Sequence, residues 1–345
     1  MATQYVASSR SRAYDRRRLV GTALSTALGF TVAGRSIAQT SGGVTPAASR
    51  GGWSFTDDRG MTVALPAAPR SVIAQTSSAA ALWDYGYQVA GIYGPSRIVS
   101  GEIDVQTGNI DLDAVTVLGD FGEIDLEAVI ALEAELYVDL DRGTGTLWYD
   151  PGSGAPEFDT LVQSVGFTAY EVSVLQPIDR FGELAAALGA DPMAPDIVAA
   201  REEMDAALTD LATVTARKPE LRVMAMAGDP ATGTYVCNPA VIPDLFTYTE
   251  HGVGIVVPEE PDPAGGGNFE NRSWEEIGRY PADVILVDSR SDLSVLEADG
   301  LWQNLPAVQA GQVGRWEGTF PLSPTGFGPV VRRLIELLER AQPLG

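Results

Sequence analysis

Residues 191–217 constrain the fold more than any other stretch, because they predict one long amphipathic helix. Asp191 is a favourable N-cap, and Pro192 suits the first turn because the amide hydrogen it lacks would have no partner there. Pro195 also suits a first turn, so a later start is the alternative. At about 1.5 Å per residue the helix would run roughly 33 Å, the length of a domain. Apolar residues recur at steps of three and four, which indicates one buried stripe: Ile197, Ala200, Met204, Leu208, Leu211 and Val214.

Two similar segments, 125–139 and 273–287, lie on either side of this helix and align without a gap. Each begins with a capping residue, Asp125 or Ser273, and continues as a short helix followed by an apolar strand. Ser273 also matches a capping box with Glu276. The repeat predicts two similar α/β halves joined by the long helix. Short helix-then-strand segments recur easily, so a chance match is the alternative.

The rest of the chain alternates short apolar strands with helices, an order typical of mostly parallel sheets with flanking helices. In the first half we expect a hairpin at 53–65, strands at 71–75, 89–93, 115–118, 136–140 and 169–174, and helices at 76–83, 125–135 and 158–165. In the second half we expect strands at 222–227, 234–237, 255–257, 284–287 and 312–315, and helices at 238–250, 273–282 and 327–340. The predicted fold is α/β, with two lobes joined by one long rigid helix.

The N-terminal residues predict an export signal. Three arginines, 16–18, precede an apolar run that ends at Ala33, and Ser36-Ile37-Ala38 is a small-residue cleavage site. The paired arginines favour the twin-arginine route. The apolar run is shorter than the ~20 residues that span a bilayer. The predicted division of the chain is a signal peptide at 1–38, a flexible linker at 39–52, a first lobe at 53–190, the connecting helix at 191–217, and a second lobe with its terminal helix at 218–345.

Charge and composition exclude several classes of function. The net charge of −23 argues against nucleic-acid binding, which needs a basic surface. Cys237 is the only cysteine, so no intrachain disulfide forms and no cysteine near the cleavage site accepts a lipid. His251 is the only histidine, which excludes a histidine-rich metal site. The chain contains no P-loop, no GxGxxG after a strand and no GxSxG, so we do not expect an enzyme.

Aromatic and arginine side chains follow several predicted strands. In α/β sheets, ligands bind outside the carboxyl ends of the strands, so these positions predict a ligand site between the two halves. The first half contributes Arg97, Trp148 and Tyr149. The second half contributes Tyr235, Phe269, Arg290, Trp316 and Phe320. For each of them, the alternative is that the side chain packs in the core or lies on the surface without a role in binding.

With these features together, the chain resembles the iron-siderophore and cobalamin class of solute-binding proteins of bacterial ABC importers, and most closely its actinobacterial siderophore-binding members. The resemblance covers nearly everything from Trp53 to Leu338. It rests on the order and spacing of short matching segments: Pro69–Ala74, Leu82–Gly86, Val89–Ile92, Ile124–Glu127, Leu147–Tyr149, Tyr280–Leu286, Leu301–Val308 and Ala310–Val313. The class has two α/β lobes joined by one long helix.

The resemblance implies a function. Glu127 and Glu275 occupy the positions at which members of the class dock onto arginines of the membrane permease. The alternative is that both are ordinary exposed helix residues. The ligand would be a ferric siderophore, which carries its own iron ligands, so no cofactor or metal is bound by the protein directly. The acidic surface favours a hydroxamate complex over an anionic catecholate.

The implied protein is a monomer, located in the periplasm or at the outer face of the cytoplasmic membrane. It partners an ABC permease and ATPase. Cobalamin or haem is the alternative ligand, and a secreted α/β enzyme is the alternative function.

Overall fold

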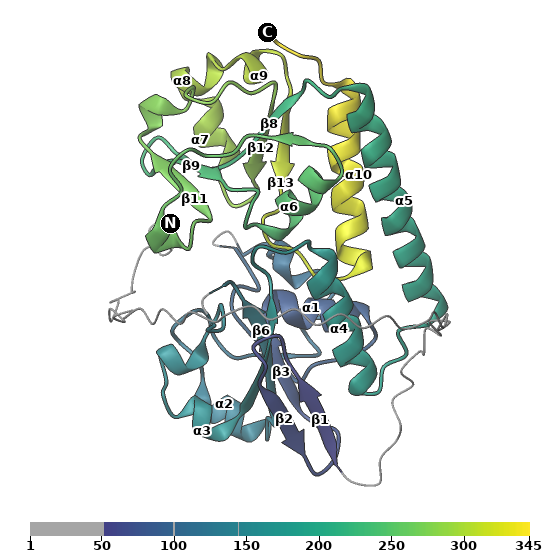
Figure 1. The fold of residues 1–345 in the computed structure, drawn as a ribbon. Coiled ribbons are helices and arrows are strands. Elements are labelled where there is room, and N and C mark those ends of the chain that lie inside the picture. The colour runs from purple at the N-terminus through teal and green to yellow at the C-terminus, as the bar shows by residue number, and fades with distance from the viewer. Residues whose placement is uncertain (1–51, 99–100, 144) are drawn as a thin grey trace, which may run out of the picture.

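The computed structural model describes residues 52–98, 101–143 and 145–345. The chain forms two lobes, each built on its own sheet, and helix α5 (Pro195–Arg217) runs along one side of the molecule (Figure 1). The predicted signal peptide and residues 39–51 of the predicted linker lie outside the described residues. None of the helices in the described part of the chain has the length and apolar character needed to cross a bilayer.

The first lobe contains a five-stranded, fully parallel sheet with the order β5-β4-β3-β6-β7. An antiparallel hairpin precedes it, as the sequence predicts: β1 (Trp53–Thr56) and β2 (Thr62–Leu65). The strands of the sheet are β3 (Val72–Gln75), β4 (Gly91–Tyr93), β5 (Thr116–Val117), β6 (Leu136–Asp141) and β7 (Gln163–Thr168). The helices are α1 (Thr76–Asp84), α2 (Leu126–Ala131), α3 (Phe158–Leu161) and α4 (Leu175–Ala187), with 3-10 turns η2 (Val105–Thr107) and η3 (Pro151–Ser153).

The second lobe contains a six-stranded mixed sheet with the order β11-β9-β8-β12-β13, and β10 also pairs with β8. The strands are β8 (Arg222–Asp229), β9 (Gly233–Cys237), β10 (Gly254–Ile255), β11 (Phe269–Arg272), β12 (Val284–Asp288) and β13 (Val313–Trp316). The helices are α6 (Pro243–Glu250), α7 (Leu293–Glu297), α8 (Gly300–Gln303), α9 (Pro306–Gln309) and α10 (Pro324–Arg340), with 3-10 turns η4 (Pro263–Gly265) and η5 (Trp274–Glu276). Pairs β8-β9 and β9-β11 are antiparallel, whereas β12 is parallel to both of its neighbours.

The strand order of the first lobe reverses between β3 and β6. From β3 the chain proceeds through β4 to the edge at β5, and then it returns to the other side of β3 as β6 and β7. A crevice opens at such a switch point, outside the carboxyl ends of the two strands. The residues that follow β3 and β6 are therefore candidates for ligand binding.

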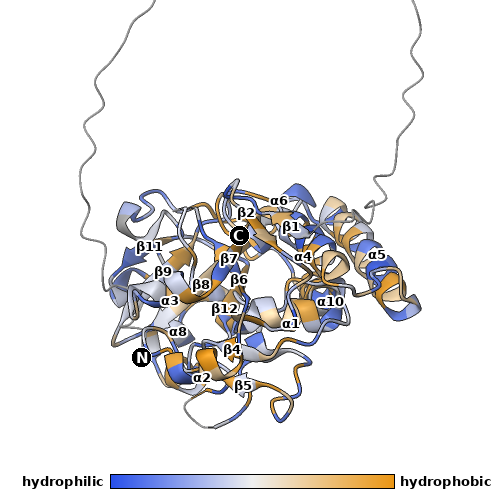
Figure 2. Ribbon diagram, turned by 90° about the horizontal axis from the view of Figure 1, so that it is seen from below, coloured by the Kyte–Doolittle hydropathy of each residue, from blue (hydrophilic) through white to orange (hydrophobic). Residues whose placement is uncertain are grey.

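Helix α5 has the predicted apolar stripe but begins later than the favoured prediction. It starts at Pro195, because the Asp191 carboxylate accepts a hydrogen bond from the Met193 amide and closes a turn there instead. Ile197, Met204 and Leu211 are buried. The stripe packs along α10, which lies beside α5 in Figure 1. In the view from below, the outer helices such as α5 carry hydrophilic residues and the central strands are largely apolar (Figure 2).

Four local predictions were wrong. The predicted helix 158–165 ends at Leu161, and the strand lies at 163–168 instead of 169–174. The predicted helix 273–282 is only the 3-10 turn η5. The capping box fails because the Ser273 side chain makes no capping hydrogen bond. The repeat therefore holds for the strands β6 and β12, whereas the helix in front of them forms only in the first copy, as α2 with Asp125 as its N-cap.

Candidate ligand-binding site

Arg142 of the first lobe and Asp244 of the second form an electrostatic link between the lobes. Arg142 directly follows β6, and Asp244 lies in the first turn of α6. Burial raises the pKa of Asp244 to about 6, while a hydrogen bond from Trp316 and the positive charge of Arg142 lower it. The carboxyl edge of the first sheet therefore faces the start of α6.

The segment after β6 presents an aromatic cluster at this boundary. The Arg142 guanidinium carbon lies 3.9 Å from the centroid of the Trp148 ring, in cation–π geometry. Trp148 and Tyr149 meet edge to face at 5.0 Å between ring centroids. Tyr149 also contacts Tyr93 at 6.2 Å and Phe121 at 5.5 Å. Phe121 is 51% exposed, so the cluster ends in an accessible ring.

The second lobe presents two buried acidic side chains, Asp244 in the first turn of α6 and Asp288 at the end of β12, each with a donor. The Trp316 indole nitrogen donates to the Asp244 carboxylate at 2.6 Å. The Arg290 Nε donates to Asp288 at 2.8 Å, and its Nη2 bonds the other oxygen of the same carboxylate. Asp288 is buried and Arg290 is exposed, so the guanidinium forms the outer part of this pair.

Tyr235 and Phe269 pack together on neighbouring strands, β9 and β11, with ring centroids 6.4 Å apart. Both rings are half-buried. The segment just before Phe269 contacts the first lobe, where the Tyr170 hydroxyl donates to the Gly266 carbonyl at 2.5 Å. Gly143 has a φ of +85°, and a Cβ there would lie only 2.3 Å from the Tyr170 ring. The glycine therefore lets Tyr170 pack against the segment that carries Trp148.

Two of the predicted ligand residues make contacts of their own. Phe320 is 5% exposed and stacks on Phe327 at 5.4 Å, which argues against a place in the wall of the site. Arg97 is exposed and donates to the Gly101 carbonyl within its own turn. Trp316 is also buried, but its hydrogen bond to Asp244 places it beneath the lobe boundary.

The predicted ligand residues do not include Asp244, Tyr170 or Arg142, although Arg142 is among the residues just past a predicted strand end. Arg142 carried a usable signal, because it comes two residues after the predicted strand 136–140. Asp244 carried none, because the predicted helix 238–250 placed it one turn inside a helix. Tyr170 was assigned to a strand that the structure places at 163–168.

The two predicted docking glutamates are both exposed. Glu127 is in the first turn of α2 and Glu275 is in η5. In the described part of the chain neither carboxylate has an ion-pair partner. Each remains available to an external cation.

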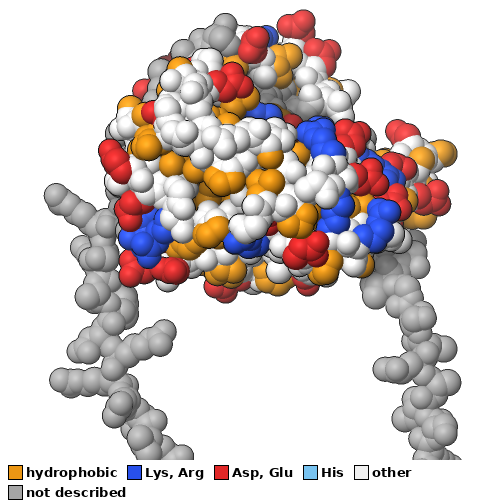
Figure 3. Space-filling view, turned by 90° about the horizontal axis from the view of Figure 1, so that it is seen from above, with side chains coloured by type: hydrophobic (Ala, Val, Ile, Leu, Met, Phe, Trp, Pro, Cys, Tyr) orange, Lys and Arg blue, Asp and Glu red, His pale blue; other side chains and the backbone are white. Residues whose placement is uncertain are grey.

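A small cavity of about 150 Å³ lies at the far end of the second lobe, where Figure 3 looks onto apolar side chains flanked by Lys and Arg. Its lining includes Arg222, Tyr280, Leu305, Pro306 and Leu344. This volume is below the 300–1,000 Å³ that small-molecule sites usually have. Within the described residues no group of His, Cys, Asp and Glu side chains is arranged to hold a metal ion. The lobe boundary is therefore the better candidate for ligand binding.

The fold matches those of known binding proteins. A solved structure of DesE, a ferric-siderophore receptor protein from Streptomyces coelicolor, is 38% identical over 85% of this chain and 100% of that chain, with a TM-score of 0.80. The siderophore periplasmic binding protein from the fuscachelin gene cluster of Thermobifida fusca is 19% identical over 79% and 96% of the two chains, with a TM-score of 0.56. PiuA, an iron uptake ABC transporter substrate-binding protein from Streptococcus pneumoniae, is 17% identical over 84% and 98%, with a TM-score of 0.60. No match was found among curated protein sequences.

The family model described as periplasmic binding protein matches residues 73–318, which run from β3 past β13 and include both sides of the lobe boundary. The chain therefore belongs to the periplasmic binding protein family, in the class that includes ferric-siderophore receptors.

Proposed function

We propose that this protein captures a ferric siderophore between its lobes and delivers it to an ABC permease, without catalysing a reaction. The observation that carries the proposal is the arrangement at the lobe boundary, where the Arg142–Trp148 pair faces Asp244 in a chain 38% identical to a ferric-siderophore receptor. A siderophore supplies its own oxygen ligands to iron, so aromatic walls and a few arginines are sufficient to enclose it.

The charges at the boundary favour a neutral or cationic hydroxamate complex over an anionic catecholate. The Arg290 guanidinium is already bonded to Asp288, and Arg142 lies close enough to Asp139 and Asp244 to lower the pKa of each. Three carboxyl groups therefore lie near only two guanidinium groups, those of Arg142 and Arg290. A highly anionic complex would meet repulsion from those carboxylates that stay ionised.

Quenching of tryptophan fluorescence by ferrioxamine B, ferrichrome and a ferric catecholate tests this proposal. We expect quenching by a hydroxamate complex, because Trp148 lies in the proposed wall. Arg142→Gln should weaken binding about tenfold or more, the cost of losing one charge-assisted contact. Arg97→Gln is the matched control and should change the affinity less than about twofold, since surface substitutions have small effects. Quenching by cobalamin or haem, and by no ferric complex, would instead favour the alternative ligands.

We propose further that Glu127 and Glu275 dock onto arginines of the permease. Their exposure and lack of an ion-pair partner in the described residues support this role. The double variant Glu127→Ala with Glu275→Ala should abolish uptake of labelled ferric siderophore by cells while leaving the affinity of the purified protein unchanged. Normal uptake by the double variant would contradict the docking role.

A further inference from the structure

Asp139 lies beneath the residues proposed to hold the ligand. Its side chain shares one face of β6 with Tyr137, and it is fully buried. The Asp139 Oδ1 accepts from the Leu140 amide, and the Oδ2 accepts from the Tyr149 amide at 2.7 Å. We define residues 145–150 as the aromatic segment. The second of these hydrogen bonds ties that segment directly to a buried carboxylate.

Other contacts bring the aromatic segment to the same strand. The Trp148 amide donates to the Leu140 carbonyl at 2.8 Å, and the Tyr137 hydroxyl donates to the Tyr149 carbonyl at 2.8 Å. The segment therefore folds back along the end of β6. Two carboxylates of β6 thus hold the segment, Asp139 through the Tyr149 amide and Asp141 through the Gly145 amide at 3.1 Å.

The groups that face Asp139 come from several elements. Tyr137 approaches the Oδ2 at 3.4 Å, and the Arg142 guanidinium provides the nearby positive charge. Tyr93 of β4 is close enough for the Asp139 charge to raise its pKa. Asp150 lies at the end of the aromatic segment and raises the pKa of Tyr137.

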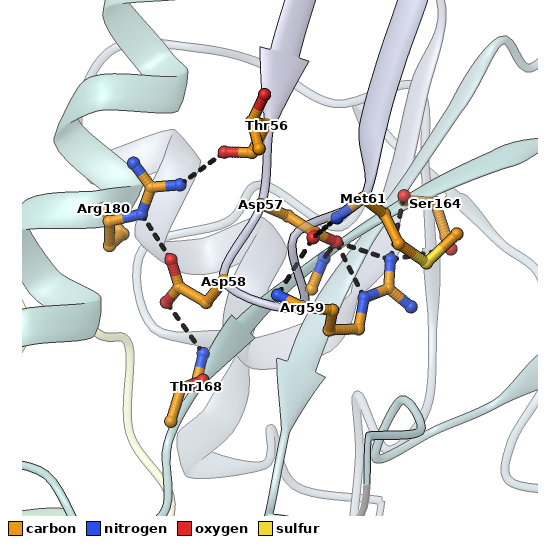
Figure 4. Close-up of polar contacts among 9 residues, drawn as sticks. Thr56, Asp57, Asp58, Arg59, Met61, Ser164, Thr168 and Arg180 are labelled. Atoms are coloured by element: carbon orange, nitrogen blue, oxygen red, sulfur yellow. Dashed lines mark hydrogen bonds and ion pairs between the residues drawn. The ribbon is translucent and has the colours of Figure 1, made fainter. Parts of the chain in front are cut away.

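The neighbouring strand β7 contributes no free charge at this face. Arg59 lies over Gly166, which pairs with Asp139 in the sheet, and Asp57 neutralises it (Figure 4). Arg142 is therefore the positive charge that balances Asp139. Burial raises the pKa of the Asp139 carboxyl to about 7, against the lowering effects of its hydrogen bonds and of Arg142.

We propose that Asp139 is a positioning residue, which holds the aromatic segment in its ligand-binding position when ionised and loosens it when protonated. Ligand affinity then falls as the pH decreases. The inference rests on the proposed function, because it assigns a regulation to the same site.

Protonation acts through one bond. A carboxylate accepts a strong hydrogen bond from the Tyr149 amide, whereas a neutral carboxyl group accepts a weaker one. If the proton sits on Oδ2, a hydroxyl group replaces the acceptor that the Tyr149 amide needs. Arg142 loses its balancing charge in the same step, so the cation over Trp148 is less firmly placed.

Two measurements on the full chain test the proposal. The first is the near-ultraviolet circular dichroism of the ligand-free protein between pH 8.5 and 5.5. We expect a transition near pH 7 that Asp139→Asn abolishes and that loses amplitude in Trp148→Phe. The second is the affinity for ferrioxamine B, which we expect to be about tenfold weaker at pH 6 than at pH 8 in the wild type, the effect of weakening one charged hydrogen bond. In Asp139→Asn the affinity should be weak at both values.

Two further variants keep the test decisive. Asp191→Asn removes an exposed carboxylate in the turn before α5 and should retain the transition. Tyr137→Phe removes a hydrogen bond that lowers the pKa of Asp139, so the midpoint should move to higher pH even if Asp139→Asn does not fold. An unchanged midpoint in Tyr137→Phe, or a wild-type transition that persists in Asp139→Asn, would overturn the proposal. If no ferric complex binds at any pH, the proposed function fails, and the dichroism of the ligand-free protein still decides the role of Asp139.

Discussion

At the scale of single residues, the lobe boundary contains buried carboxylates, each with a hydrogen-bond donor of its own. Asp244 accepts from the Trp316 indole and lies near Arg142, and Asp288 holds the Arg290 guanidinium. Buried charges persist in proteins where they are paired and hydrogen-bonded in this way. Such pairs fix the direction of each arginine before any ligand arrives, which reduces the ordering that binding requires.

Asp244 makes stability depend on pH in a predictable direction. Its pKa is about 6 in the folded protein, above the usual value, chiefly because it is buried. The folded state therefore binds more protons than the unfolded state between about pH 4 and 6. The resulting stabilisation is complete below the unfolded pKa and is lost as the pH rises through 6. The melting temperature of the wild type should thus fall relative to that of Asp244→Asn between pH 4.5 and 7.5. A constant difference would contradict this assignment.

At the scale of elements, the first hairpin is attached to β7 by two carboxylates of its turn, Asp57 and Asp58, and Asp57 is the more deeply buried. Asp57 follows β1 and accepts hydrogen bonds from the Arg59 and Met61 amides, the Arg59 side chain and the Gly166 amide of β7 (Figure 4). Its side chain is fully buried. The turn therefore depends on Asp57 both for its own shape and for its contact with the edge strand.

Replacing this carboxylate should be costly. Asp57→Ala leaves the Arg59 guanidinium with Ser164 but without its carboxylate partner, and it leaves the Gly166 amide without its acceptor. Breaking a buried ion pair in this way costs about 3 to 5 kcal/mol. Thr62→Ala is a matched control in the same hairpin, because its hydroxyl bonds only the exposed Thr56. It should cost less than about 1 kcal/mol. Urea denaturation of both variants measures the difference, and similar losses would contradict the attachment role.

Helices α5 and α10 pack together at a point where α10 carries a glycine, Gly328. A Cβ built on Gly328 would lie 3.6 Å from the Met204 Cα, which is ordinary contact distance. Both residues are buried. The contact therefore has space for a methyl group and for little more.

This geometry predicts different outcomes for two substitutions at one position. Gly328→Ala should change the free energy of unfolding by less than about 1 kcal/mol, because the gain in helix propensity is offset by crowding against the following Pro329. Gly328→Leu should cost about 1 to 3 kcal/mol, since it overfills the contact with Met204. Thermal unfolding distinguishes the two, and equal effects would show that the helices separate easily.

At the scale of the whole molecule, the two lobes are connected by more than α5. The Ser323 hydroxyl at the start of α10 bonds Asp84 of α1, although the two residues are 239 positions apart. Ser173 bonds Thr247 of α6 at 2.9 Å, and the Glu171 amide donates to the Val241 carbonyl. These links join the lobes at separate points. They oppose a large rotation of one lobe against the other.

We therefore predict only a small closure on ligand binding. The radius of gyration from X-ray scattering should change by less than about 1 Å when ferrioxamine B is added, as in pre-organised complexes generally. Crystal structures with and without the ligand give an independent measure. A hinge rotation that separates Ser323 from Asp84 would contradict the prediction.

The sequence alone determined the features that depend on near neighbours in the chain. The apolar steps of three and four along α5, and the short apolar runs of β6, β8 and β12, predict their elements because burial of one face repeats within each element. The α/β class and the family resemblance follow from the order of these elements. They were predicted before any contact between distant residues was known.

Only the tertiary structure decided which side chains form the candidate site. Nothing near Phe320 in the sequence shows that it stacks on Phe327, and nothing near Arg290 shows that the Asp288 carboxylate holds its side chain in place. Asp244 meets Trp316 across 72 positions, so neither residue predicts the other. The physical reason is that periodicity is a local property, whereas burial and pairing at a strand end depend on the distant elements that fold against it.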